Sequence, residues 1–216
     1  MHKSSNQMFI VVAGNIGSGK TTLTNMLSKK LDFKPFYESV QDNPYLKDFY
    51  SDMSRWSFAL QVYFLTHRFK THKSIENSGF SAIQDRSIYE DANIFARALF
   101  EQGDFDKRDY ENYLNLYYSM TEHLGYPTLM IFLKRSLPKL QERIKKRGRD
   151  YESAIEVDYL NRLNHYYDDW FDNYDKGKYL IVDTDDLDFL ENPNDFDRLV
   201  SKIFECIDQQ DLFYRF

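Results

Sequence analysis

The sequence predicts an α/β fold in which a five-stranded parallel sheet is flanked by helices on both faces. Short apolar runs alternate along the chain with longer stretches of helical character, which is typical of this class. Several of the runs are apolar throughout rather than at every second residue, as in strands that are covered on both faces. The length of 216 residues fits one domain that is large enough to bury a core. We therefore expect a single domain over residues 1–216.

The expected elements follow in order along the chain. The five strands are expected at residues 9–13, 36–38, 81–85, 128–133 and 179–182. The helices are expected at residues 20–31, 55–77, 87–102, 107–124, 137–147, 154–174 and 195–209. The first helix directly follows a glycine cluster, and the second is long and aromatic on one side. Ligands collect at the carboxyl ends of parallel strands, so the residues after each strand are the first candidates for a site.

Composition and charge exclude several classes of protein. Lys plus Arg number 28 and Asp plus Glu number 34, and the resulting net charge of −6 argues against a general nucleic-acid binder. Cys206 is the only cysteine, so no intrachain disulfide can form, which suits a reducing, cytoplasmic environment. No apolar run approaches the roughly 20 residues of a membrane span. Residues 1–7 lack the apolar stretch of a signal peptide and are expected to be a flexible tail.

A glycine-rich turn follows the first expected strand. It fits the phosphate-binding pattern G-x-x-x-x-G-K-[ST] and consists of Gly14, Asn15, Ile16, Gly17, Ser18, Gly19, Lys20 and Thr21, followed by Thr22. Glycines let successive N–H groups point at an anion, and the next helix adds the positive end of its dipole. We expect a nucleoside triphosphate such as ATP here, with Lys20 on its β- and γ-phosphates and Thr21 as a Mg²⁺ ligand. A chance glycine-rich turn is a poor alternative, because the turn follows an apolar strand and precedes a helix, as phosphate binding by such a loop requires.

The phosphate loop alone does not separate a kinase from a GTPase-type switch. A switch would carry an N-K-x-D segment that reads guanine and a D-x-x-G segment after the third strand. Neither is present, and the third expected strand runs instead into Asp85, Arg86 and Ser87. A small-molecule kinase needs an acceptor pocket, a base near the acceptor hydroxyl and mobile cations over the phosphates.

The acceptor side is expected at the ends of the second and third strands. Glu38 would face the phosphate loop there and accept the proton of an attacking hydroxyl. Asp85 would hold Mg²⁺ directly or through water, and Arg86 would bind the acceptor oxygen or a phosphate. Taken singly, each has a plain alternative: Glu38 as a solvated loop carboxylate, and Asp85 with Arg86 as a surface ion pair.

Two helix faces carry residues suited to a nucleobase. Gln61, Phe64 and Arg68 are spaced by three and four residues, which places them on one face, and Asp91 and Phe95 share a face of the next helix. The Gln61 amide both donates and accepts hydrogen bonds, and an aromatic ring stacks on a base. The alternative is that the rings belong to the core and the polar groups are exposed.

Arginines gather late in the chain and suggest a lid over about residues 143–153. Arg143 and Arg147 are four residues apart on one helix face, and Gly148 separates them from Arg149. Such a segment would close over a triphosphate and neutralise the charge that develops during transfer. The alternative is a solvated basic helix end that complements the helix dipole.

Together and in this order, these residues resemble the deoxyribonucleoside kinase family, and the stretch 43–46 (Asn-Pro-Tyr-Leu) resembles its bacterial deoxyadenosine/deoxyguanosine kinase group. The resemblance covers nearly the whole chain and implies a P-loop kinase fold. It also implies that Glu38 is the base for the 5′-hydroxyl and that Arg86 holds this hydroxyl. The chain departs from the family where Asp85 replaces a frequent Glu and Ser39 replaces a common Pro, and the shorter carboxylate of Asp85 suits a water-mediated contact with Mg²⁺.

The resemblance further assigns the substrate contacts. Tyr50 and Glu152 match the positions that bind the sugar 3′-hydroxyl. Gln61 matches the residue that pairs with the edge of the base, and Phe95 matches the ring that stacks on the base. Arg147 and Arg149 match the lid, with Arg143 on its approach. The family also implies a homodimer, and the aromatic helices at 87–102 and 107–124 offer apolar surface for one.

The pair Arg68 and Asp91 bears on the preferred base. Relatives that favour thymidine usually have apolar residues here. A thymine carbonyl would meet the carboxylate as an unpaired polar contact, whereas Asp91 accepts from an exocyclic amino group or from a protonated or tautomeric ring N–H. We therefore expect ATP-dependent phosphorylation of a purine deoxynucleoside, deoxyadenosine before deoxyguanosine, with deoxycytidine tolerated. The alternatives are a thymidylate-type monophosphate kinase, which needs extra arginines in the acceptor pocket, and a regulator that binds nucleotide without turnover.

Overall fold

The computed structural model describes residues 7–38, 43–149, 152, 155–185 and 187–208, and the backbone of 213–215. Six strands form one sheet in the order β2-β3-β1-β4-β5-β6, and every neighbouring pair is parallel. The strands are β1 (Phe9–Gly14), β2 (Lys34–Phe36), β3 (Ala82–Asp85), β4 (Leu129–Lys134), β5 (Tyr179–Asp183) and β6 (Phe213–Arg215). The five predicted strands are confirmed, and the short β6 adds a sixth at the edge beside β5.

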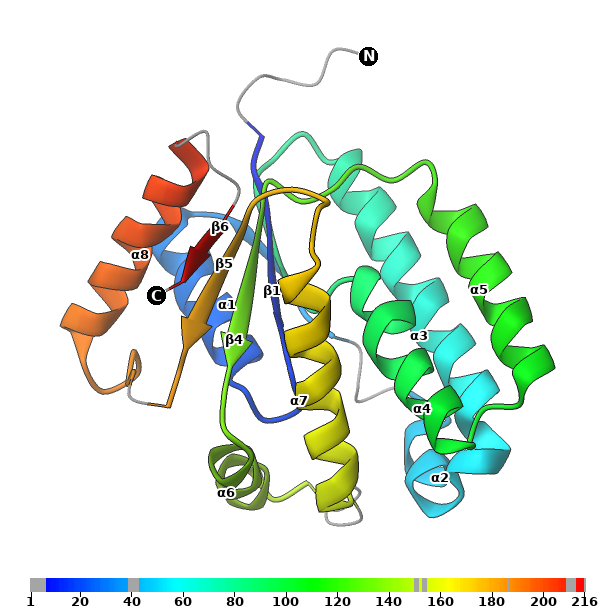
Figure 1. Ribbon diagram of the computed structural model, residues 1–216. Helices are drawn as coiled ribbons and strands as arrows, with labels where there is room; N and C mark the ends of the chain where they lie inside the picture. The colour runs from blue at the N-terminus through cyan, green and yellow to red at the C-terminus, as the bar shows by residue number, and fades with distance from the viewer. Residues whose placement is uncertain are drawn as a thin grey trace.

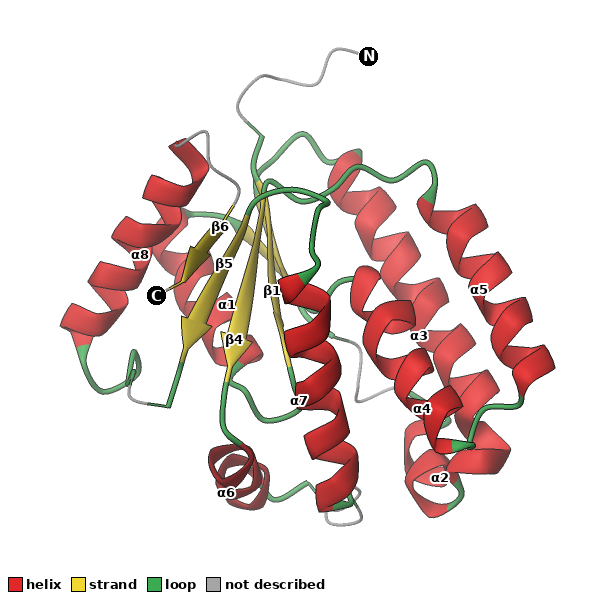
Figure 2. Ribbon diagram, in the orientation of Figure 1, coloured by secondary structure: helices red, strands yellow, loops and turns green. Residues whose placement is uncertain are grey.

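Helices cover both faces of the sheet, as predicted (Figure 1). The helices are α1 (Lys20–Leu31), α2 (Leu46–Ser51), α3 (Met53–Glu76), α4 (Arg97–Gln102), α5 (Lys107–Thr121), α6 (Leu137–Arg147), α7 (Val157–Asp172) and α8 (Pro193–Asp208), and η1 (Asp91–Ala96) is a π-helix. Figure 2 shows α1 and α8 on one face and the group of α3, α4, α5 and α7 on the other. None of the helices in the described ranges has the length and apolarity to cross a membrane.

Alternate residues of β1 pack into two apolar cores, one on each face of the sheet. Ile10 and Val12 pack in a cluster with residues of α1 and α8, whereas Val11 and Ala13 pack in the larger cluster with residues of α3, η1, α5 and α7. All four side chains have no exposed surface. A strand buried on both faces must be apolar throughout, which explains the continuous runs in the sequence.

Three elements differ from the sequence-based expectation. The second strand was expected at 36–38 and lies at Lys34–Phe36, because its register against β3 pairs Lys34 with Ala82 and Phe36 with Gln84. Glu38 therefore follows the strand instead of ending it. The helix expected over 87–102 is divided into η1 and α4, and the short α2 was not expected at all.

Two predicted segments lie partly outside the described residues. Of the expected tail only Gln7 is described, and its side-chain amide donates to the carbonyl of Ile75 at 3.1 Å. Of the expected lid, residues 143–149 and Glu152 are described, while 150, 151 and 153 are not. Ser39 also lies outside the described residues.

Candidate active site

The glycine-rich loop joins β1 to α1 at the carboxyl edge of the sheet. Gly14 (φ 145°) leaves no room for a side chain, because a Cβ atom there would lie 2.8 Å from the carbonyl oxygen of Leu133. Inside the loop, Lys20 Nζ donates to the Asn15 carbonyl at 2.8 Å. The Asn15 amide donates to the Leu160 carbonyl at 2.9 Å, which ties the loop to α7. Asn15 and Ser18 are buried, so they shape the loop from within.

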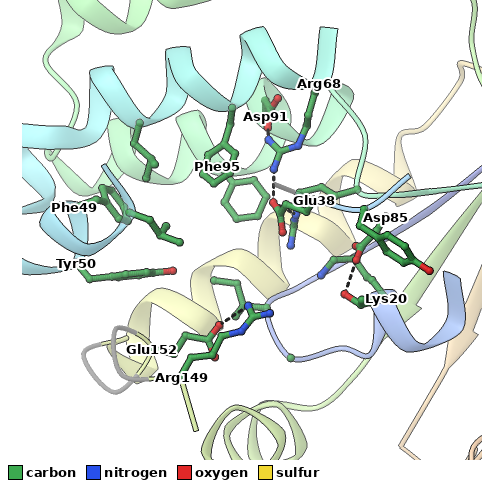
Figure 3. A pocket seen from close by; sticks show the side chains of 18 of the residues that line it. Lys20, Glu38, Phe49, Tyr50, Arg68, Asp85, Asp91, Phe95, Arg149 and Glu152 are labelled. Carbon is green, nitrogen blue, oxygen red and sulfur yellow. Dashed lines mark hydrogen bonds and ion pairs between the residues drawn. The ribbon is translucent and has the colours of Figure 1, made fainter. Parts of the chain in front are cut away.

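Two cavities meet at this loop. The first cavity, of about 140 Å³, lies beside α3 and η1, and Figure 3 shows its lining side chains. The second cavity, of about 680 Å³, lies between the loop, α6 and the segment after β5. Five residues line both cavities: Gly17, Lys20, Thr21, Arg147 and Arg149. A ligand in one cavity therefore faces a ligand in the other across Lys20 and Thr21.

The first cavity brings together most of the predicted site residues. The predicted site residues that line the first cavity but not the second are Ile16, Glu38, Tyr50, Gln61, Phe64, Arg68, Asp85, Arg86, Asp91, Phe95 and Glu152. They come from the phosphate loop, the ends of β2 and β3, the helices α2, α3 and η1, and, for Glu152, the segment between α6 and α7. Gly19, Thr22 and Arg143 line the second cavity instead, and Gly14, Asn15 and Ser18 line neither.

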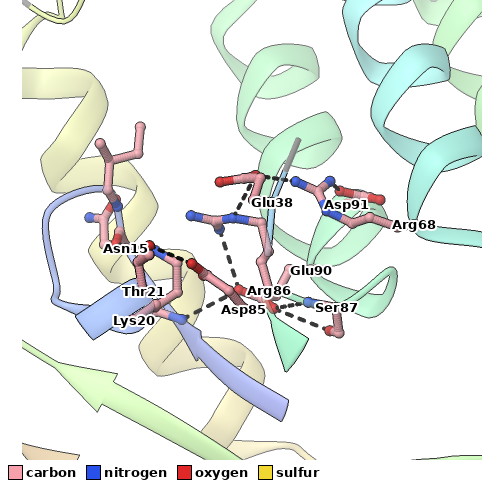
Figure 4. A network of polar contacts seen from close by, with 12 residues as sticks. Asn15, Lys20, Thr21, Glu38, Arg68, Asp85, Arg86, Ser87, Glu90 and Asp91 are labelled. Carbon is pink, nitrogen blue, oxygen red and sulfur yellow. Dashed lines mark hydrogen bonds and ion pairs between the residues drawn. The ribbon is translucent and has the colours of Figure 1, made fainter. Parts of the chain in front are cut away.

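Opposite charges alternate along one wall of the first cavity (Figure 4). Arg68 donates to Asp91 through one terminal nitrogen and to Glu38 through the other. The same oxygen of Glu38, Oε1, lies 3.1 Å from Nε of Arg86. Burial alone would raise the pKa of Glu38, but Arg86, Arg68 and Lys20 outweigh it and lower this pKa from 4.5 to about 2. Glu38 is therefore ionised at neutral pH.

Lys20, Thr21 and Asp85 occupy the junction of the two cavities. Burial and the nearby Arg86 lower the pKa of Lys20 from 10.5 to about 8. The Thr21 hydroxyl donates to Oδ2 of Asp85 at 2.5 Å, and Oδ1 of Asp85 is buried with no hydrogen-bond partner. Burial raises the pKa of Asp85 above its ordinary 3.8. A buried acceptor without a donor suits a cation, so these two side chains fit Mg²⁺.

A cation at this junction would share its coordination with a bound phosphate. Among the described residues, no three His, Cys, Asp or Glu side chains gather in a way that would hold a metal on their own. Mg²⁺ is commonly bound by one or two protein oxygens with waters and substrate phosphates, so the small donor set of Thr21 and Asp85 agrees with that mode.

Polar and aromatic groups line the part of the first cavity farther from the loop. Gln61 is 3% exposed, and its Oε1 has no hydrogen-bond partner. Oδ2 of Asp91 is also buried without a partner. The guanidinium carbons of Arg68 and Arg86 lie 4.5 Å from the ring centres of Phe64 and Phe95, respectively. Unpaired acceptors beside aromatic rings suit a flat, polar ligand.

Two arginines of the segment predicted to be a lid contact Glu152. Its carboxylate is 4% exposed and accepts from Arg147 Nη2 at 2.5 Å and from Arg149 Nη1 at 3.3 Å. Arg147 closes α6, and Gly148 (φ 64°) ends that helix in the left-handed conformation that favours glycine. The arginines thus border both cavities, whereas Glu152 borders only the first.

Comparison with known proteins identifies the family. The sequence profile of a family described as deoxynucleoside kinase matches residues 10–208. The chain belongs to the deoxynucleoside kinase family. Among its curated relatives, the deoxyadenosine/deoxycytidine kinase of Bacillus subtilis is 38% identical over 95% of this chain and 96% of that protein. The deoxyguanosine kinase of the same organism is 36% identical over 92% of this chain and 97% of that protein.

Solved structures agree with this membership. The deoxyadenosine kinase of M. mycoides with bound dATP superposes with a TM-score of 0.79 at 32% identity, covering 91% of this chain and all of that one. A second structure of that kinase, with the products dCMP and dCDP, gives a TM-score of 0.80 at 31% identity, over 92% of this chain and all of that one. The protein is thus a deoxynucleoside kinase, and ATP is the donor that this family uses.

Sequence reasoning missed several residues of this deoxynucleoside kinase site. Those that line the first cavity are Tyr37, Leu46, Phe49, Leu60 and Tyr159. In the second cavity, the buried Arg135 donates to Oγ1 of Thr184 at 2.9 Å. The apolar residues carry no chemical signature that separates cavity from core. Leu46 belongs to the stretch 43–46, which the family resemblance had already marked.

Proposed function

We propose that this kinase transfers the γ-phosphate of ATP to the 5′-hydroxyl of a purine deoxynucleoside, with deoxyadenosine favoured over deoxyguanosine and with deoxycytidine tolerated. One observation carries the proposal: the two cavities meet at Lys20 and Thr21, and Glu38 lines only the first of them. The first cavity is then the acceptor site and the second the donor site. Transfer across Lys20 needs no large movement of either substrate.

Glu38 is the proposed base. It accepts the proton of the 5′-hydroxyl while that oxygen bonds to the γ-phosphorus and the bond to the β–γ bridging oxygen breaks, so that ADP leaves. Arg86 holds the attacking oxygen, since its Nε lies 3.1 Å from the Glu38 carboxylate. Lys20 neutralises charge on the phosphates. Mg²⁺, held by Thr21 and by Asp85 directly or through water, would offset the negative charge of the β- and γ-phosphates.

Base choice rests on Gln61, Asp91 and Arg68. The unpartnered oxygens of Gln61 and Asp91 are acceptors, so they favour a base with an exocyclic amino group. Adenine, guanine and cytosine each carry an amino group, whereas thymine carries none. The names of the relatives, which include deoxyadenosine/deoxycytidine and deoxyguanosine kinases, support the same set of substrates. Phe95 is the ring proposed to stack on the base, beside Phe64.

The sugar and the lid complete the site. Tyr50 and Glu152 are the proposed partners of the 3′-hydroxyl, and both line the first cavity. Arg147 and Arg149 border both cavities, and Arg143 borders the second, which suits cations that close over the phosphates.

We also propose that the protein acts as a cytoplasmic homodimer. Helix α5 carries Leu116 and Tyr118, which have 38% and 61% of their surfaces exposed, and such large apolar groups suit burial against a second copy. Sedimentation of the full chain would give twice the mass of 26.0 kDa, and a monomeric mass at working concentration would refute the dimer.

The direct test is an acceptor panel with Mg²⁺-ATP. The four deoxynucleosides and deoxyadenosine monophosphate are offered separately, and products are resolved by chromatography, with Lys20→Met as the inactive control. We expect 5′-monophosphates, formed fastest from deoxyadenosine and slowest from thymidine. Preference for thymidine would refute the proposed base choice. Preference for the monophosphate would support a monophosphate kinase, and binding without any product would support a regulator.

A further inference from the structure

Glu90 is a charged side chain with no exposed surface, on the helical residue immediately before η1. Its Oε1 accepts from the Gly14 N–H at 3.3 Å, from Arg86 Nη1 at 3.3 Å and from the Tyr167 hydroxyl at 2.7 Å. Its Oε2 accepts from the backbone N–H and the hydroxyl of Ser87 at 2.7 and 3.1 Å. A carboxylate offers about four lone-pair directions, so these five donors use all of its accepting capacity.

Helix capping explains only part of this arrangement. Ser87 and Glu90 form the S-x-x-E pattern in which a glutamate reaches back to the backbone N–H of the capping residue. That pattern accounts for the bonds to Ser87. It does not account for the donors from Gly14, Arg86 and Tyr167, which come from the phosphate loop, the end of β3 and α7. If the carboxylate only capped the helix, the two bonds to Ser87 would offset little of the free energy that its desolvation costs.

Arg86 is one of the donors to Glu90, and Tyr167 contacts both residues. Arg86 has φ 67°, a left-handed conformation that residues with a Cβ rarely adopt and that surrounding contacts must maintain. Its Nη1 meets Glu90 and also donates to the Tyr167 hydroxyl at 2.7 Å. Its Nε meets Glu38, so the guanidinium spans from the interior to the first cavity (Figure 4).

We infer that Glu90 is a positioning residue for phosphoryl transfer, which fixes the Arg86 guanidinium relative to the phosphate loop, with Tyr167 as its second support. Through Gly14, the same carboxylate holds the beginning of the loop that carries the donor phosphates. One buried carboxylate thus fixes both Arg86, on the acceptor side, and the start of the loop on the donor side. This inference rests on the proposed role of Arg86 at the 5′-hydroxyl and adds Glu90 and Tyr167, which that proposal does not use.

The test compares Glu90→Gln and Tyr167→Phe with Tyr166→Phe. Tyr166 is the neighbouring residue on α7, and its hydroxyl donates to Glu101 outside both cavities. Loss of a supporting partner typically reduces activity by about 10- to 100-fold, and we expect such a fall in kcat for Glu90→Gln. We expect a smaller fall for Tyr167→Phe and an unchanged kcat for Tyr166→Phe. KM for deoxyadenosine and for ATP should stay within about threefold, because their other contacts remain.

A double-mutant cycle separates positioning from folding support. If Glu90 acts through Arg86, then Glu90→Gln has no further effect on kcat in an Arg86→Met background. If the kcat losses of the two single variants multiply in the double variant, the inference is overturned. It is also overturned if the fall in kcat of Glu90→Gln equals the fall in the fraction of protein that binds deoxyadenosine, as measured by calorimetry. Should Glu90→Gln fail to fold, full kcat in Tyr167→Phe would overturn it. If Arg86→Met itself keeps full kcat, the proposed role of Arg86 has failed first.

Discussion

Arg68 donates to Glu38 in the wall of the first cavity, and its other terminal nitrogen donates to Asp91. One guanidinium therefore connects the proposed proton acceptor with a residue proposed to read the base. Because Glu38 also meets Arg86, the four side chains form a row of alternating charge from the base end of the cavity to the phosphate loop. Binding of a base that engages Asp91 would change the charge around Glu38 through a single intervening residue.

The Arg68–Asp91 pair should be strongly coupled in stability. Arg68→Met leaves the carboxylate of Asp91, which has no exposed surface, without its cation, and such a loss costs about 3–5 kcal/mol. The double variant Arg68→Met with Asp91→Leu removes both charges and should recover most of that loss. Urea unfolding of the two variants and the parent measures this. A double variant as unstable as Arg68→Met would contradict the pairing.

The pKa of Glu38 predicts a specific pH dependence of stability. It is lowered from 4.5 to about 2 in the folded protein, so the pairing with arginine stabilises the fold fully above pH 4.5 and is lost as the pH falls toward 2. The unfolding free energy of the parent should therefore exceed that of Glu38→Gln by a constant amount near neutral pH. This difference should shrink between pH 4.5 and 2. A difference that is the same at neutral pH and at pH 3 would contradict the ion pairing.

Thr21 should set the requirement for Mg²⁺. Thr21→Val keeps the shape of the side chain and removes its hydroxyl, whereas Thr21→Ser keeps the hydroxyl and serves as the matched control. We expect the Mg²⁺ concentration at half-maximal rate to rise by about tenfold or more in Thr21→Val and to stay nearly unchanged in Thr21→Ser. Removing Mg²⁺ with EDTA should abolish turnover in all three proteins. An equal response of both variants would exclude the hydroxyl as a ligand.

The two arginines of the proposed lid should affect kcat. Arg147 and Arg149 border both cavities, and cations that stabilise a transferring phosphoryl group contribute about 10³-fold or more to kcat in related chemistry. Arg149→Met should therefore lower kcat far more than it raises KM for deoxyadenosine. Arg108→Met on α5, where the side chain is 87% exposed, should leave kcat unchanged. Equal kcat in the two variants would remove Arg149 from the proposed mechanism.

The sequence predicted those parts of the fold that local rules determine. The glycine loop has a fixed spacing, and continuous apolar runs indicate buried strands, so β1 and α1 were predicted almost to the residue. Glu38 and Arg86 meet because parallel strands end at one edge of a sheet. The start of β2 was missed because its register comes from pairing with β3. The six-residue α2 and the π-helix η1 were missed because local propensity does not predict them.

Glu90 shows where a local pattern was present but too weak to interpret. The spacing Ser87-x-x-Glu90 indicates a helix cap, yet only the fold brings Gly14 and Tyr167 to the same carboxylate. These partners lie 76 and 77 residues away along the chain, which no periodicity reports. In the same way, Arg68 was predicted on the correct helix face, but its contact with Glu38 depends on how α3 packs beside the end of β2.

The most direct test of the account is turnover by Glu38→Gln, measured together with its affinity for deoxyadenosine. The amide keeps the size of the side chain but does not accept the proton, so kcat should fall by about 100-fold or more while the dissociation constant for deoxyadenosine from calorimetry stays nearly the same. Near-full turnover by Glu38→Gln would contradict the proposal that this carboxylate activates the 5′-hydroxyl.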